Sequence, residues 1–179
     1  MTQPRRNGFV RGTIIAVTIA VAGGSVGGLV YWNKMTEQRE RHALDKIGML
    51  GDEQNAIGQS YARTLSGIES LRTEFRRLVD SNPEVPTGQL RVLADETTLE
   101  VVKSRGLESD VDLVVDYVAD LDVCIAEKRC DPRVATGLHS PLAALRNWEQ
   151  WYRPYLEARQ DSAPGRESAF YRYLRRAPA

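Results

Sequence analysis

The sequence predicts an all-α protein with an N-terminal transmembrane helix followed by a soluble bundle of five or six helices. The run from Gly12 to Asn33 contains no charged residue, and roughly twenty apolar residues are enough to cross the hydrocarbon core of a bilayer. Beyond it, apolar residues recur at spacings of three and four, the period of a helix. The expected domains are a basic tail (1–11), a transmembrane helix (12–33), a helical stalk (34–51) and an α-helical domain (52–176).

The flanks of the apolar run are typical of a membrane span. Tyr31 and Trp32 stand where aromatic side chains meet the lipid interface, and Arg11 and Lys34 bracket the run with charges. Basic residues lie on both sides of the run in similar numbers, so the positive-inside rule favours neither orientation clearly. A short tail before an apolar run is the layout of an uncleaved signal anchor. We therefore expect a single-pass membrane protein whose body is exported, which in a bacterium would be an inner-membrane protein with a periplasmic body.

Cleavage of the N-terminus is an alternative to the anchor. The triplet Ala20-Val21-Ala22 matches the small-residue pattern of a signal-peptidase site, which would release a body that begins at Gly23. The apolar stretch before this site is short, and the apolar run continues beyond it. The anchor is therefore the favoured interpretation.

Glycines within the span suggest a contact with a second helix. They form two overlapping G-x-x-x-G pairs, a spacing that lets two membrane helices approach closely. This predicts a homodimer through the span, although glycine is also common in membrane helices that do not dimerise. The residues of the predicted dimer face are Gly23, Gly24, Gly27 and Gly28.

The body divides into helices at proline, glycine and capping residues. Asp52 is the expected N-cap of a helix that ends before Pro83, and a Ser109-Asp110 cap is expected for the central, most apolar helix. Pro154 is expected to bend its helix without ending it. The predicted helices are 52–81, 87–105, 110–128, a short one after Asp131-Pro132, 141–159 and 165–176.

Three aspartates recur every four residues on the central helix, namely Asp112, Asp116 and Asp120. Stacked carboxylates of this kind, with His139, are the basis of an alternative hypothesis of an enzyme with an acidic site. Like charges at this spacing repel each other. The favoured interpretation is a solvated face or ion pairs with arginines of a neighbouring helix, for which Arg146 and Arg153 are present.

The two cysteines predict a disulfide. Cys124 and Cys130 are too far apart in one continuous helix to bond. Because Asp131-Pro132 is typical of the start of a new helix, the chain is expected to turn before it and to bring the cysteines together. Persistent disulfides belong to oxidising compartments, which favours an exported body. Zinc is not expected, because no C-x-x-C and no nearby histidine pair completes four ligands.

An aromatic face follows on the helix 141–159, where Trp148, Trp151, Tyr152 and Tyr155 recur at helical spacing. Packing in the core is the favoured interpretation. The alternative is an interaction surface, for which the candidate residues are Trp148, Trp151 and Arg153.

The C-terminal third contains the segments VVDYVADLDVCIAEKRCDPRVA, NWEQWYRPYLEARQ and SAFYRYLRR. Together they resemble the C-terminal half of a family of small bacterial proteins that carry one N-terminal membrane span and a helical domain of unknown function. A tryptophan before Arg153-Pro154, then Arg159 and Phe170, match its pattern, whereas the usual glycine of the turn is replaced by the region of Cys130. The resemblance implies the architecture and no activity.

Composition and motifs together favour a protein that acts by binding. Basic and acidic residues balance at 24 each, so nucleic acid is not an expected partner. No catalytic motif or cofactor site is recognised. We expect a membrane-anchored interaction or scaffold protein of the bacterial envelope, in contact with the lipid bilayer and a protein partner and not an enzyme. The alternatives are the acidic-site enzyme and an accessory protein that faces the cytoplasm.

Overall fold

The computed structural model describes residues 31–137, 140–159 and 164–176. The described residues are all-α and contain no strand, as predicted. Contacts divide the chain into two compact units, 1–39 and 40–179, and the second contains all the helices from α2 to α7. Residues 31–49 are helical, and the helices after them are α2 (Ala56–Ser81), α3 (Thr87–Ser104), α4 (Glu108–Ala126), α5 (Pro132–Thr136), α6 (Leu142–Arg159) and α7 (Pro164–Leu174).

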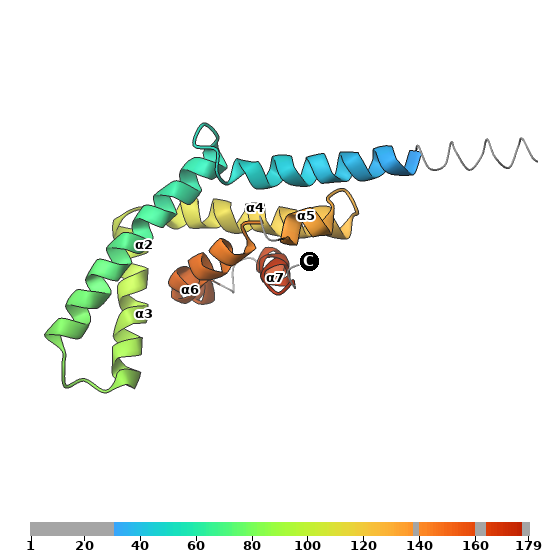
Figure 1. Cartoon of the computed structure of the whole chain (residues 1–179). Helices are drawn as coiled ribbons and strands as arrows, with labels where there is room; N and C mark the ends of the chain where they lie inside the picture. The colour runs from blue at the N-terminus through green and yellow to red at the C-terminus, as the bar shows by residue number, and fades with distance from the viewer. Residues whose placement is uncertain (1–30, 138–139, 160–163, 177–179) are drawn as a thin grey trace, which may run out of the picture. The chain divides into compact units, whose positions relative to one another are not determined.

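Helix α4 lies at the centre of the fold, with α2 on one side and α7 packed along it (Figure 1). This position explains its apolar sequence, because several of its side chains are completely buried. Helices α6 and α7 supply the large aromatic residues of the core. The fully buried side chains of these three helices include Val111, Val114, Val118, Leu121, Leu145, Trp148, Tyr152, Phe170 and Tyr173.

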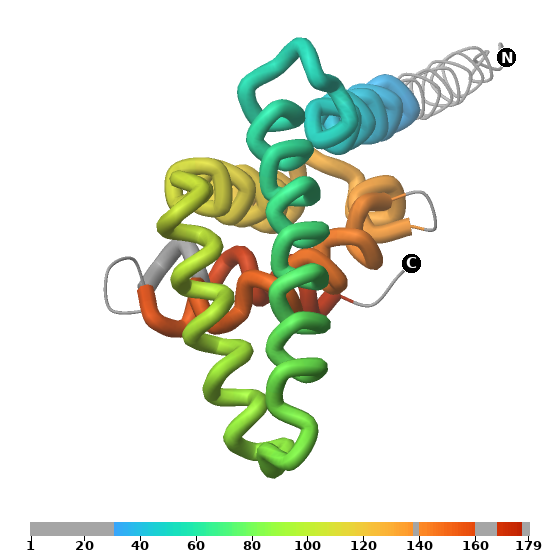
Figure 2. Tube along the Cα trace, turned by 90° about the vertical axis from the view of Figure 1, so that its left-hand side faces the viewer, coloured from blue at the N-terminus to red at the C-terminus, as the bar shows by residue number. Residues whose placement is uncertain are grey.

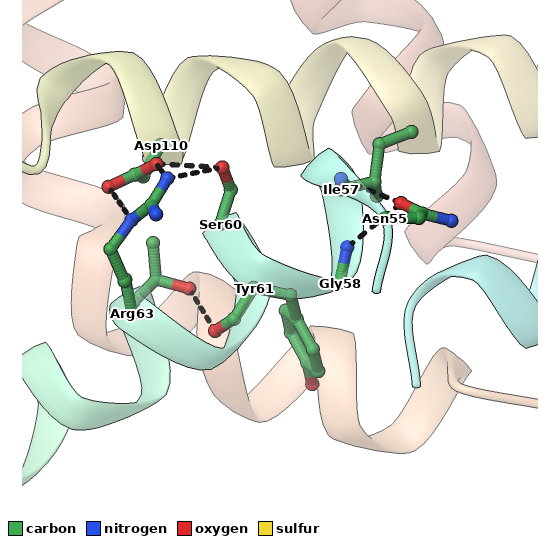
Figure 3. Close-up of polar contacts among 8 residues, drawn as sticks. Asn55, Ile57, Gly58, Ser60, Tyr61, Arg63 and Asp110 are labelled. Carbon is green, nitrogen blue, oxygen red and sulfur yellow. Dashed lines mark hydrogen bonds and ion pairs between the residues drawn. The ribbon is translucent and has the colours of Figure 1, made fainter. Parts of the chain in front are cut away.

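Helix α2 begins later than predicted. Asn55 is its N-cap, and the Asn55 side-chain oxygen accepts hydrogen bonds from the amides of Ile57 and Gly58 at 2.8 and 3.3 Å (Figure 3). The expected cap, Asp52, instead accepts from the amide of Gln54 in the preceding turn. Both residues favour helix starts, and the sequence does not decide between two such candidates so close together.

The start of α4 also differs from prediction. The chain leaves α3 through Gly106, whose φ of +62° is in the left-handed region that glycine adopts without strain. The amide of Leu107 then donates to the carbonyl of Val102 at 2.9 Å, which ends α3. Helix α4 begins at Glu108 without a side-chain cap. The predicted Ser109-Asp110 cap is wrong, because Asp110 lies inside the first turn.

The later elements follow their local signals. Asp131 caps α5, its side chain accepting from the amide of Arg133 at 2.7 Å. Ser140 accepts from the amide of Leu142 at 3.5 Å at the start of α6. Helix α6 continues through Pro154 to its end at Arg159, as expected.

The segment before α2 belongs partly to the body. Ala43 and Leu50 are buried in the core, and the hydroxyl of Tyr117 on α4 donates to the carbonyl of Lys46. The compact unit therefore begins at Glu40. Residues 40–51 of the expected stalk pack against the helical domain and do not stand apart from it.

The predicted membrane span lies almost entirely outside the described residues. Of the run 12–33 only Tyr31, Trp32 and Asn33 are described, and all three are exposed. The glycines of the predicted dimer face, 23, 24, 27 and 28, fall outside as well. Within the described part of the chain, none of the helices is both long enough and apolar enough to cross a membrane.

Candidate functional site

The α2–α3 hairpin is the candidate site, defined here as residues 72–97. In both views the far halves of α2 and α3 lie side by side and extend past α4, α6 and α7 (Figures 1 and 2). Between Leu71 on α2 and Thr98 on α3, both buried, every residue keeps some solvent exposure. The hairpin is therefore two helices that no third layer covers completely.

Apolar side chains remain uncovered on this hairpin. Val79 is 53% exposed and Val92 is 57% exposed. Isolated helices of this length are marginal in water, and most helical stability in proteins comes from burying an apolar face. On the same helix as Val79, the side chains of Phe75 and Leu78 are only partly buried.

An open cleft of about 620 Å³ lies between α2 and α3. Its volume is within the range of small-ligand sites, but its lining is polar and carries both signs of charge. Glu74 and Arg77 form an ion pair at 3.0 Å within this lining. The other polar residues of the cleft include Ser81, Thr97, Glu100 and Arg105.

Trp151, a predicted interaction residue, connects α6 to the base of the hairpin. Its ring stacks on Phe75 with centroids 5.7 Å apart, and the guanidinium of Arg72 lies 5.3 Å from its centroid. A cation over an indole face is a favourable arrangement. Trp151 is only partly buried, so it remains part of the surface beside the candidate site.

Trp148 is not a surface residue, and its assignment as an interaction residue is corrected. It is completely buried, and its indole Nε1 donates to the hydroxyl of Thr64 at 2.8 Å. Tyr152 lies beside it, with its hydroxyl donating to the carbonyl of Thr64 at 2.5 Å. Burial raises the pKa of Tyr152 above its usual value. The core-packing interpretation of the aromatic face therefore holds for these two residues.

Arg153 is exposed and bound to a neighbour on its own helix. Its guanidinium donates to both carboxylate oxygens of Glu149, at 2.9 and 3.0 Å. Arg146 does not meet an aspartate either, because it donates to the carbonyls of Leu174 and Arg176 at the end of α7. The two arginines expected to pair with the aspartates are thus engaged elsewhere.

The three aspartates of α4 have different surroundings. Asp112 forms an ion pair with Arg159 of α6 and accepts from the hydroxyl of Tyr155 at 3.3 Å. Asp116 is partly buried, and Asp120 is exposed. Asp112 thus pairs with an arginine of a neighbouring helix, as the favoured interpretation expects, although with a different arginine. His139, the remaining residue of the enzyme hypothesis, lies outside the described residues.

The sequence reasoning missed two buried aspartates on the same helix. Asp110 accepts from Arg63 at 2.8 and 2.5 Å and from Ser60 at 2.7 Å (Figure 3). The hydrogen bond from Arg63 holds the pKa of the Asp110 carboxyl below its usual value, against burial, which raises it, and with help from Ser60. Hydrogen bonds to the charged form of a carboxyl act in this direction.

Asp122 is the second, with 1% of its side chain exposed. It accepts from Arg172 at 2.9 Å and from Arg176 at 2.5 Å, which ties α4 to α7. The apolar neighbours of Asp122 on the most apolar helix could have predicted that it is buried. A buried carboxylate needs a cationic partner, so an arginine contact could have been expected there.

The predicted disulfide is present. The sulfurs of Cys124 and Cys130 are bonded, their Cα atoms are 5.3 Å apart, and both residues are buried. The chain turns between them through Lys128, whose φ is +59°, and the amide of Cys130 donates to the carbonyl of Cys124 at 3.1 Å. His42 lies next to this pair, with a ring nitrogen and the two sulfurs all within 4.8 Å of one another.

Comparisons with protein-family models, curated proteins and solved structures give no match to this chain.

Proposed function

We propose that the chain is a membrane-anchored interaction protein of the bacterial envelope that binds a protein partner through the α2–α3 hairpin. The observation that carries the proposal is the absence of any buried residue along the described stretch 72–97, in helices that leave Val79 and Val92 exposed. A partner that covers the hairpin would bury these apolar groups and stabilise the two helices.

The charges of the hairpin favour a protein partner over nucleic acid. Exposed arginines concentrate on α2 and exposed acids on α3, so the surface presents both signs. Nucleic-acid binding depends on a continuous basic surface, whereas protein interfaces commonly pair opposite charges around an apolar centre. The exposed charged residues on the helices of the hairpin are Arg72, Arg76, Arg77 and Asp80 on α2 and Arg91, Asp95 and Glu96 on α3.

The disulfide supports the periplasmic placement of the body. Cys124 and Cys130 are bonded in the structure, and bonds of this kind persist in oxidising compartments and are rare in the reducing cytoplasm. With the apolar N-terminal run as an anchor, the hairpin would lie in the periplasm.

Site-specific photocrosslinking tests the binding surface. A photoreactive amino acid is placed at Val79 or at Val92 in intact cells, and at Val123 of α4 as a matched control, since Val123 is also an exposed valine on a helix. We expect protein adducts of defined mass from the two hairpin positions and none from Val123. An adduct of twice the chain mass identifies a second copy as the partner. Equal adducts at all three positions, or none at the hairpin, contradict the proposal.

Topology is tested with a separate reporter. Val79→Cys introduces an exposed thiol on the hairpin, while Cys124 and Cys130 remain bonded and buried. A membrane-impermeant maleimide should label this thiol once the outer membrane is permeabilised and the inner membrane is intact. Labelling that requires lysis of the inner membrane would place the body in the cytoplasm and rule out the periplasmic assignment.

A further inference from the structure

His42, Cys124 and Cys130 bring together three strong metal-binding side chains. One ring nitrogen of His42 and both sulfurs lie within 4.8 Å of one another, although the histidine comes from the helical segment before α2 and the cysteines from the end of α4 and the turn that follows. The sequence argument against zinc depended on the lack of a C-x-x-C motif and of a nearby histidine pair that would complete four ligands. Folding supplies one histidine from a distant part of the chain.

The surrounding contacts hold these residues at one place. Ala43, next to His42, is buried, and Tyr117 binds the carbonyl of Lys46, so the segment that carries the histidine is fixed against α4. The two cysteines are held at one corner by the bond from the Cys130 amide to the Cys124 carbonyl. That backbone hydrogen bond does not depend on the bond between the sulfurs, so the corner can keep the cysteines close after reduction.

We propose that in the reduced chain Cys124, Cys130 and His42 bind one thiophilic d¹⁰ metal ion, Cu(I) or Zn²⁺. Thiolate sulfur and neutral imidazole are the ligands that these ions prefer. The cysteines are buried, whereas His42 is exposed, so the exposed side of the site is open to solvent. Cu(I) is satisfied by the three protein ligands, and Zn²⁺ would add water as its fourth ligand.

The disulfide form and the metal-bound form exclude each other because both use the sulfurs of Cys124 and Cys130. A dithiol reductant breaks the bond between the sulfurs, delivers two electrons and two protons to them, and is itself oxidised to a disulfide. The metal ion then displaces the two thiol protons into solvent and keeps its oxidation state. The ion joins the segment of His42 to α4, whereas the disulfide joins α4 only to its own turn.

Metal titration of the reduced full-length chain tests the proposal. The purified chain is reduced with a water-soluble phosphine, which becomes the phosphine oxide with oxygen from water, and the phosphine is removed without oxygen. Cu(I) and Zn²⁺ are titrated in separate arms against a chromophoric chelator. We expect one equivalent of at least one ion to bind, with thiolate-to-metal absorption in the Cu(I) arm, and no such binding in the unreduced chain.

The variants assign the ligands. Cys124→Ser/Cys130→Ser should abolish the stoichiometric binding, and His42→Ala should weaken it at least about tenfold, since losing even a supporting partner of a ligand has an effect of that size. Arg41→Ala, an exposed neighbour outside the cluster, is the matched control and should bind as the parent does. Binding by neither ion, or equal affinity in His42→Ala and Arg41→Ala, overturns the proposal. Circular dichroism of each reduced sample is recorded, and unfolding that neither ion reverses also overturns it.

Discussion

The indole Nε1 of Trp148 donates a hydrogen bond to the hydroxyl of Thr64 at 2.8 Å, across 84 residues of the chain. Both residues are completely buried, and the Thr64 hydroxyl donates in turn to the carbonyl of Tyr61 at 2.7 Å. This relay joins α6 to α2 at the base of the hairpin. The proposed interaction surface is therefore supported by a buried polar contact as well as by apolar packing.

Thr64→Val should destabilise the fold by about 1–3 kcal/mol, because the isosteric valine leaves the buried indole N–H without an acceptor. Thr64→Ser is the control: it keeps the hydroxyl and loses one methyl group, which costs about 0.8 kcal/mol. Urea unfolding followed by circular dichroism measures both. A serine variant less stable than the valine variant would show that the methyl packing matters more than the hydrogen bond.

Gly67→Ala should also destabilise the fold, by about 1–3 kcal/mol. A Cβ added at Gly67 would lie 2.5 Å from the Tyr152 hydroxyl and 2.6 Å from a methyl of Leu107. The hydroxyl cannot retreat without losing its bond to the Thr64 carbonyl. Gly88→Ala is the matched control, since nothing lies within 4 Å of a Cβ at that position, and it should stabilise α3 by up to about 1 kcal/mol. Equal effects of the two alanines on the urea midpoint would contradict this assignment.

The helices were predictable because their signals are local. Prolines, glycines and capping residues mark their ends, and the apolar spacing marks the buried face of α4, so the all-α class and most bounds follow from neighbouring residues. Asn55 and Asp52 show the limit of this reasoning, because both are good N-caps and only the packing of the finished helix selects Asn55.

The long-range contacts were less predictable, because each of them joins residues that are distant in the chain. Gly67 is surrounded by side chains from distant parts of the chain, because the Tyr152 hydroxyl and a methyl of Leu107 occupy the space that a Cβ there would need. Asp110 accepts a hydrogen bond from Arg63, which is 47 residues away in the chain, and no local spacing indicates that contact. His42 and the two cysteines are likewise distant in the chain and close in the fold. The exposure of the hairpin could not be predicted for another reason. Its apolar residues recur with the period of a core-facing helix, and the sequence does not show that no further helix covers them completely.

Lys128→Gly should stabilise the corner by about 1 kcal/mol. Lys128 has a φ of +59°, and the left-handed region costs an L-residue roughly that amount relative to glycine. Lys103→Gly, in the last turn of α3, should instead destabilise the fold by up to about 1 kcal/mol. Thermal unfolding under oxidising conditions compares the two variants with the parent. A Lys128→Gly variant that melts below the parent would contradict the proposed backbone strain.

Removal of both arginines that bind Asp122 should lower the free energy of unfolding more than removal of the Asp122 charge. Arg172→Met/Arg176→Met leaves a buried carboxylate without a cationic partner, for which we expect a loss of about 3 kcal/mol or more. Asp122→Asn removes the charge itself and should cost about 1–3 kcal/mol. The control is Arg129→Met, whose ion pair with Glu127 is exposed and should contribute less than about 1 kcal/mol. Urea unfolding at neutral pH ranks the three, and a double variant more stable than Asp122→Asn would contradict the burial argument.

The Asp110–Arg63 pair should make the stability of the fold depend on pH in the acid range. Hydrogen bonding from Arg63 lowers the pKa of Asp110 in the folded chain, whereas an aspartate in the unfolded chain has a pKa of about 3.9. A depressed carboxyl pKa stabilises the fold above the unfolded pKa, and this contribution is lost as the pH falls through the folded pKa. Asp110→Asn should therefore be less stable at pH 7 but decline less steeply below about pH 4, so that the two curves converge. Urea unfolding from pH 7 to pH 2 measures this, with Asp80→Asn, an exposed acid of α2, as the control; parallel curves for parent and Asp110→Asn would rule out the contribution.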